Sequence, residues 1–172
     1  FSIDSKNRMF IGDCGEATVE SVYLLDDLYP ATPYNLGWPI FEGTERRKED
    51  PSNFQAMLPP IYEYRHFSDG GKGGVGDCVV GGFFLDDPKV YLFGDISGFL
   101  RMLKKQEDGK WHEIHSQRVP RYLFSFGYDE GTKKLFLSTD WNGPPKIFEL
   151  SIPSGKINLL PQVTLCRTTM LD

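Results

Sequence analysis

Short hydrophobic segments alternate with polar turns along most of the chain, and three stretches repeat the same order of elements. Each stretch begins with a short aromatic strand, passes through a polar turn into a second apolar strand, and ends that strand on Asp before a Gly-containing turn. These stretches are residues 1–15, 82–98 and 124–143, and their strand-ending residues are Asp13, Asp95 and Asp140. Because a repeated order of elements is typical of repeat architectures, we interpret these aspartates as equivalent positions in a repeated structural unit.

Two further strand-like segments follow the aspartate in the second and third stretches, and Gly-containing turns join them. Four strands in roughly 40–45 residues is the period of a β-propeller blade. The sequence therefore predicts an all-β fold of β-propeller blades, each with four antiparallel strands. The expected units lie near residues 1–66, 78–115 and 122–161, so residues 1–161 form a partial β-propeller of two to three blades, and residues 162–172 form a C-terminal tail or a closing strand.

Composition excludes some functions. The net charge is −5, whereas a nucleic-acid-binding protein needs a basic face, so we expect no nucleic-acid partner. No apolar run approaches the roughly 18–20 residues of a membrane helix, and no signal-peptide pattern is present. The chain opens on Phe1 inside a strand-like pattern. We therefore expect a piece of a longer polypeptide, and remaining blades that come from that polypeptide or from another chain.

The three cysteines do not have the spacing of a zinc motif. They are Cys14, Cys78 and Cys166. An odd count allows at most one disulfide within the chain, and buried free thiols are the alternative. The sequence leaves the two open.

Six segments, in this order, resemble the signature of glucose/sorbosone-dehydrogenase-type propellers, and most closely the hedgehog-interacting-protein-like subgroup. The segments are 9–15 (MFIGDCG), 35–43 (NLGWPIFEG), 58–66 (LPPIYEYRH), 80–83 (VGGF), 91–98 (YLFGDISG) and 124–130 (FSFGYDE). The resemblance implies a six-bladed propeller of which this chain supplies the C-terminal half, and an extracellular or secretory location. Catalytic members of the family oxidise sugars with pyrroloquinoline quinone (PQQ) and calcium.

The residues that would hold these cofactors depart from the family pattern. The counterpart of the family's calcium-binding turn retains two candidate metal ligands, Asp13 and Glu16, but lacks the family's Pro. The alternative for Asp13 is a structural role, in which a strand-end aspartate accepts hydrogen bonds from turn amides. The arginine pair that contacts the quinone corresponds to Arg118 and Arg121, which are three residues apart, so at least one is expected to point away. The family's lysine after the strand at 90–93 is missing.

The remaining candidate residues are one tryptophan and three histidines. Trp38 is either a sugar-stacking platform or a packing residue. The family's catalytic histidine would lie in earlier blades, and we expect surface or packing roles for His66, His112 and His115. His112 and His115 should point to opposite faces of a strand. We therefore assign no catalytic residue.

Three functions follow from this sequence. The favoured interpretation is a sugar-dehydrogenase-like propeller segment with a degraded quinone and calcium site. It would act as a binding or assembly module, or as a subunit of a larger complex, and would bind no cofactor. One alternative is an active PQQ- and calcium-dependent sugar oxidoreductase with a divergent site. The other is a lectin-like carbohydrate-binding propeller.

Overall fold

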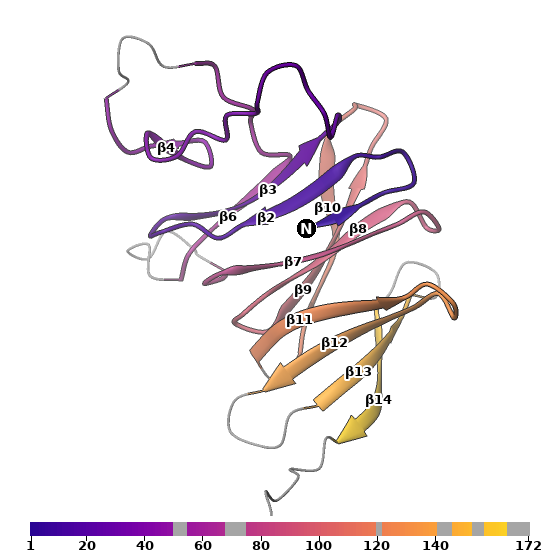
Figure 1. The fold of residues 1–172 in the computed structure, drawn as a ribbon. Helices are drawn as coiled ribbons and strands as arrows, with labels where there is room; N and C mark the ends of the chain where they lie inside the picture. The colour runs from indigo at the N-terminus through magenta and orange to yellow at the C-terminus, as the bar shows by residue number, and fades with distance from the viewer. Residues whose placement is uncertain (50–54, 68–74, 120–121, 141–145, 153–156, 165–172) are drawn as a thin grey trace, which may run out of the picture.

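The computed structural model describes residues 1–49, 55–67, 75–119, 122–140, 146–152 and 157–164. Within these ranges the chain is all-β, and its strands form three four-stranded antiparallel sheets and one small hairpin. Figure 1 shows the three sheets one after another along the molecule, in the order of the sequence. No helix in the described ranges is long and apolar enough to cross a membrane.

Each large sheet is a meander in which neighbouring strands are consecutive or nearly so. The first sheet contains β1 (Ser2–Ile3), β2 (Met9–Asp13), β3 (Val19–Leu25) and β6 (Tyr62–Arg65). The second contains β7 (Val79–Leu85), β8 (Val90–Asp95), β9 (Phe99–Lys105) and β10 (Trp111–Arg118). The third contains β11 (Tyr122–Asp129), β12 (Lys134–Asp140), β13 (Lys146–Ser151) and β14 (Asn158–Thr164). The hairpin pairs β4 (Phe41–Glu42) with β5 (Glu45–Arg46).

This arrangement is a partial propeller-like fold, as the repeated pattern predicts. The second strand of each sheet ends on one of the repeated aspartates, Asp13, Asp95 or Asp140. The fourth strands extend beyond the expected unit ends, since β10 reaches Arg118 and β14 reaches Thr164. Residues 162–164 therefore belong to a strand of the third sheet.

Side chains on β8 connect all three sheets, because successive residues of a strand point to opposite faces. Tyr91 and Phe93 join an apolar cluster with residues of the first sheet, and Val90 and Leu92 join another with residues of the third sheet. All four are buried. On the face toward the third sheet, a Cβ at Gly94 would lie 2.7 Å from a methyl carbon of Leu123, so glycine allows the close approach of β11.

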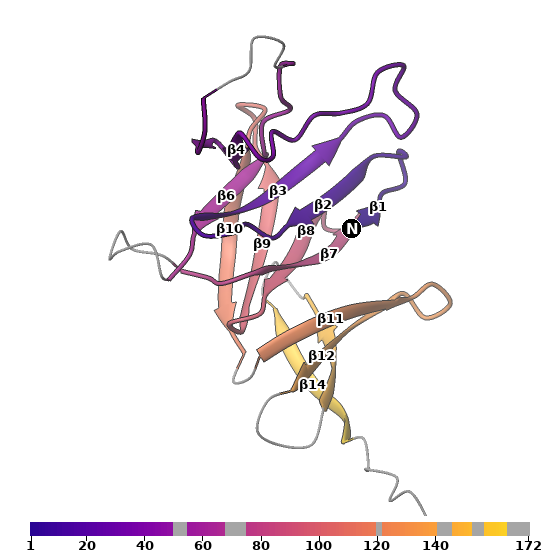
Figure 2. The same cartoon turned by 60° about the vertical axis from the view of Figure 1, so that its left-hand side comes forward.

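The long connection between β3 and β6 covers the other face of the first sheet. On β3, Val19, Ser21 and Tyr23 lie on the side opposite the second sheet, yet all three are buried. The Tyr23 hydroxyl donates to the Leu36 carbonyl at 3.2 Å, and the β4–β5 hairpin packs beside Val19. Figure 2 shows this connection extending away from the stacked sheets. It positions the residues of the candidate site.

The outer strand of the second sheet corrects one expectation. The pairing of β10 with β9 shifts between Glu113 and His115, which is a β-bulge. His112 pairs with Lys104 and His115 pairs with Met102. Because Lys104 and Met102 are two residues apart on β9, the bulge places both histidines on the same face, not on opposite faces as predicted.

Candidate functional site

The loop that follows β2 and the connection after β3 enclose a small cavity of about 220 Å³. Its walls are formed by Asp13, Cys14, Gly15, Glu16, Val19, Ser21, Trp38, Phe41, Glu42 and Gly43. Three residues singled out in the sequence, Asp13, Glu16 and Trp38, therefore meet at one place. Trp38 is 56% exposed and is available to solvent at this site.

A buried carboxylate, Glu42, organises the loop beside the cavity. Its Oε1 accepts hydrogen bonds from the backbone amides of Ala17, Thr18 and Val19 at 2.7–3.1 Å. Burial opposes the charged form, but these amides outweigh it and lower the pKa of Glu42 to about 2. Burial and the charge of Glu42 raise the pKa of the nearby Asp13 carboxyl.

The guanidinium of Arg47 supplies the positive charge of this site. Its Nη1 contacts Glu16 Oε2 and lies 3.3 Å from Glu42 Oε2. Its Cζ lies 5.1 Å from the centre of the Trp38 ring, within the range of a cation–π contact. Arg47 therefore neutralises two of the three carboxylates and covers the indole face.

These residues do not fit a bound calcium ion. Calcium takes six to eight oxygen ligands, including several carboxylate oxygens. Here Glu42 Oε1 is used by three amides, and Glu16 and Glu42 Oε2 face the guanidinium. Of the three acidic residues, Asp13 remains, and one carboxylate does not make such a site.

Of the described residues proposed as quinone contacts, Trp38 lines this cavity and Arg118 does not. Arg118 ends β10, the outer strand of the second sheet, and its Cζ lies 4.9 Å from the Phe99 ring centre. Trp38 belongs to the connection that covers the first sheet. Arg121 lies outside the described residues, so its place relative to Arg118 stays a prediction.

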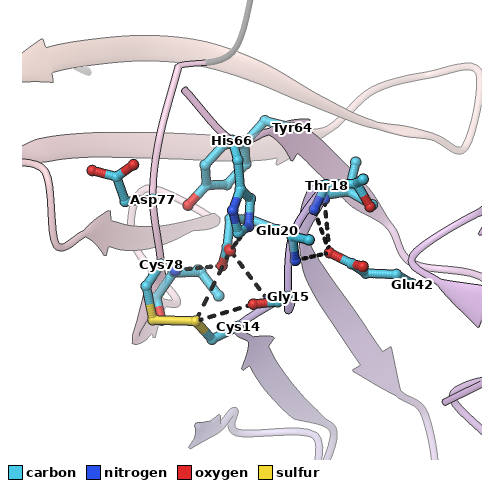
Figure 3. Close-up of polar contacts among 12 residues, drawn as sticks. Cys14, Gly15, Thr18, Glu20, Glu42, Tyr64, His66, Asp77 and Cys78 are labelled. Carbon is cyan, nitrogen blue, oxygen red and sulfur yellow. Dashed lines mark hydrogen bonds and ion pairs between the residues drawn. A yellow bond between two sulfur atoms is a disulfide. The ribbon is translucent and has the colours of Figure 1, made fainter. Parts of the chain in front are cut away.

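A second polar cluster lies between the first and second sheets (Figure 3). Cys14, directly after β2, forms a disulfide with Cys78, directly before β7. This pairing resolves the alternative that the sequence left open, and Cys166 lies outside the described residues. Beside the disulfide, Glu20 of β3 is fully buried and forms an ion pair with His66.

The Glu20 carboxylate links both sheets. Its Oε1 accepts from the Gly15 amide at 3.2 Å, and its Oε2 accepts from the Val79 amide at 2.5 Å. Burial raises the pKa of Glu20 to about 7, although the Val79 hydrogen bond and the charge of His66 favour the ionised form. His66, expected to serve at the surface or in packing, is thus a buried partner of a buried acid.

The repeated aspartates differ in their surroundings. Asp95 is fully buried and accepts from the Tyr64 hydroxyl at 2.7 Å, from the Ser97 amide at 2.8 Å and from the Asp77 amide at 3.1 Å. Burial and the charge of Asp95 raise the pKa of Tyr64. Asp13 instead is exposed at the cavity, and the side chain of Asp140 lies outside the described part of the structure.

Sequence reasoning gave no site role to four of the residues that organise these clusters: Glu20, Glu42, Arg47 and His66, the last of which was expected at the surface or in packing. A usable signal exists for Glu20, the one charged residue inside the largely apolar strand 19–25, because buried charges require a partner. Arg47 lies in a charged loop that resembles any solvated segment. Comparisons of the chain with family models, with curated proteins and with solved structures find no match.

Proposed function

We propose that this chain is a segment of a sugar-dehydrogenase-like β-propeller that acts as a non-catalytic binding or assembly module. The observation that carries the proposal is the state of the candidate calcium site. Arg47 faces two of its carboxylates and three backbone amides hold Glu42. A guanidinium at this position supplies fixed positive charge without the Lewis acidity that a divalent cation would give a quinone carbonyl.

The quinone side of the proposal rests on charge and position. A cofactor with several carboxylates needs cationic groups that converge on it. Arg118 packs against Phe99 on the second sheet, and no lysine stands between residues 94 and 103. This distribution favours a segment that binds no PQQ.

The outer face of the third sheet supports the assembly role. Leu135 and Leu137 of β12 pack toward the second sheet, so Phe136 between them points to the opposite face. Phe124 and Leu160 are 42% and 45% exposed, and Leu160 stands in register with Phe136 through Glu149. The Lys134–Glu149 ion pair lies on the same face between these apolar residues. A mixed face with exposed apolar side chains suits contact with another blade, since each propeller blade packs between two others.

Isothermal titration with PQQ and calcium chloride tests the cofactor part. The expected result is no binding of either, with a calcium- and quinone-dependent sugar dehydrogenase as the positive control. Dye-linked oxidation of aldoses should stay at background. Micromolar or tighter PQQ binding together with turnover would restore the oxidoreductase alternative, and glycan binding without PQQ would favour the lectin-like one.

Sedimentation velocity tests the assembly part on residues 1–172. We expect self-association. Phe124→Lys and Leu160→Lys should each reduce it, because each substitution replaces an exposed apolar side chain of the third sheet with a charged one. Tyr29→Lys is the matched control, since Tyr29 is 90% exposed in the connection after β3 and should leave association unchanged. A monodisperse wild-type monomer that unfolds cooperatively would contradict the assembly role.

A further inference from the structure

Three side chains with metal-binding atoms converge between the first and second sheets, and the His66 imidazole lies on the Glu20 carboxylate beside them (Figure 3). The Sγ atoms of Cys14 and Cys78 and a carboxylate oxygen of Glu20 all lie within 4.8 Å of one another. Cys14 Sγ is 3.9 Å from Glu20 Oε1, and His66 Nε2 contacts the same Oε1. These four residues, the Cys–Glu–His cluster, come from sequence positions whose spacing matches no zinc motif.

We propose that the Cys–Glu–His cluster is a redox-gated zinc site, which binds Zn²⁺ when the Cys14–Cys78 disulfide is reduced. Two thiolates, one imidazole nitrogen and one carboxylate oxygen form a tetrahedral donor set that zinc accepts. Ligand atoms around one tetrahedral zinc ion lie roughly 3–4 Å apart, the range of the Cys14–Glu20 separation.

Burial supports a site that a cation would complete. Glu20 is fully buried and His66 is 6% exposed, so each requires a partner that offsets the loss of water. In the oxidised protein they serve each other. A zinc ion would replace the proton that they share, and the Val79 amide, which already donates to Glu20 Oε2, would orient the carboxylate.

The two cysteines lie at strand ends, and Cys14 is accessible to solvent. Cys14 follows the last residue of β2 and Cys78 precedes the first residue of β7, and the Cys78 carbonyl accepts from the Ile96 amide at 2.9 Å. Cys14 is exposed, which gives a reductant and an ion a path to the cluster. The reduction consumes two equivalents of a small thiol: the Cys14–Cys78 bond breaks, two protein thiols form, and the small thiol becomes its disulfide. Zinc then binds and the two thiols release their protons to solvent.

Cobalt titration of the full chain tests the proposal, in a Cys166→Ser background that leaves two cysteines. After reduction, Co²⁺ should give thiolate charge-transfer absorption and strong visible bands of a tetrahedral site, and one equivalent of Zn²⁺ should abolish them. The oxidised protein should give neither. Reduced protein that binds Co²⁺ and Zn²⁺ no better than the Cys14→Ser/Cys78→Ser variant would overturn the proposal.

Competition with a chromophoric zinc chelator measures the contribution of the buried pair. His66→Gln and Glu20→Gln should each weaken zinc binding by at least the roughly 10- to 100-fold that loss of an outer-shell partner costs. His112→Gln is the matched control, because His112 also pairs with a carboxylate, Asp108 at 2.9 Å, but is exposed. Equal affinities in all three variants would exclude His66 and Glu20 as ligands.

X-ray absorption of the reduced, zinc-loaded chain with wild-type cluster residues gives an answer that needs no substitution in the cluster. The expected first shell is two sulfur and two nitrogen or oxygen atoms. A shell of sulfur alone, or one without sulfur, would overturn the assignment.

Discussion

The two interfaces between the three sheets are built differently. Between the second and third sheets, aliphatic and aromatic residues of β7, β8 and β9 pack on those of β11 and β12. Between the first and second sheets, an aromatic cluster around Phe10 and Tyr91 lies beside a disulfide, a buried ion pair and a buried aspartate. The same repeated strand pattern thus supports one interface through packing alone and another through packing plus cross-links. We call the interface between the first and second sheets the first interface, and that between the second and third sheets the second interface. The stability of the first interface should respond to redox state and pH, and that of the second should not.

The largest expected effect is that of the disulfide. The linked residues are 64 positions apart, and closing a loop of that length stabilises a fold by about 4 kcal/mol in the chain-entropy description. The Cys14→Ser/Cys78→Ser variant should lose about that much unfolding free energy in urea, measured with a metal chelator present. Cys166→Ser is the control. Unchanged stability in the double variant would show that the cross-link adds nothing to the first interface.

Truncation of an apolar residue tests the other interface. Leu123 is fully buried against Gly94 and its neighbours, so Leu123→Ala should cost about 3 kcal/mol through lost burial and a cavity. Hydrogen exchange should speed up in the third sheet and not around the disulfide. The adjacent Phe124→Ala, at an exposed position, should change stability by less than about 1 kcal/mol. Equal losses of unfolding free energy in Leu123→Ala and Phe124→Ala would contradict the buried position of Leu123 and the exposed position of Phe124.

The buried acid makes the first interface pH-dependent. The pKa of Glu20 is about 7 in the fold against about 4.3 for an unperturbed Glu, so between these values the native state binds more protons than the unfolded state. Unfolding free energy should therefore fall as pH rises through this window, by roughly 3–4 kcal/mol, and Glu20→Gln should flatten the curve.

Glu42 provides the control of opposite sign. Its pKa is about 2, so its contribution is present above about pH 4.3 and is lost as pH falls toward 2. Glu42→Gln should remove the slope in that acidic range and lower the unfolding free energy by a constant amount at higher pH. A slope between pH 5 and 7 that survives Glu20→Gln would assign the dependence to another group.

The smallest expected effect is that of a single hydroxyl. Tyr64→Phe removes the donor to Asp95, while the Ser97 and Asp77 amides remain, and should cost about 2 kcal/mol. Tyr62→Phe is the comparison, because Tyr62 donates to the more exposed Glu113 and should cost less. A larger loss of unfolding free energy in Tyr62→Phe than in Tyr64→Phe would show that the Tyr62–Glu113 hydrogen bond contributes more than the Tyr64–Asp95 one.

Local patterns in the sequence specify the strands and their grouping into sheets. Each strand is a local event, set by alternation and by turn residues within a few positions, so the repeats that end on Asp13, Asp95 and Asp140 correspond to the second strands of three sheets. Sequence analysis singled out Asp13, Glu16 and Trp38 as candidate site residues, and all three line one cavity. It did not place Arg47 among them.

The packing of segments that are distant in sequence specifies which side chains meet. Arg47 reaches Glu16 across 31 positions, and Cys14 reaches Cys78 across 64, through connections whose paths no local pattern encodes. This packing also specifies the environment of each repeat, since Asp95 lies between two sheets and Asp13 beside a cavity. The bulge in β10 shows the same limit at short range, because one extra residue reverses the face of a side chain without a mark in the alternating pattern. Local periodicity specifies strands, whereas charge neutralisation and burial between distant segments specify the site.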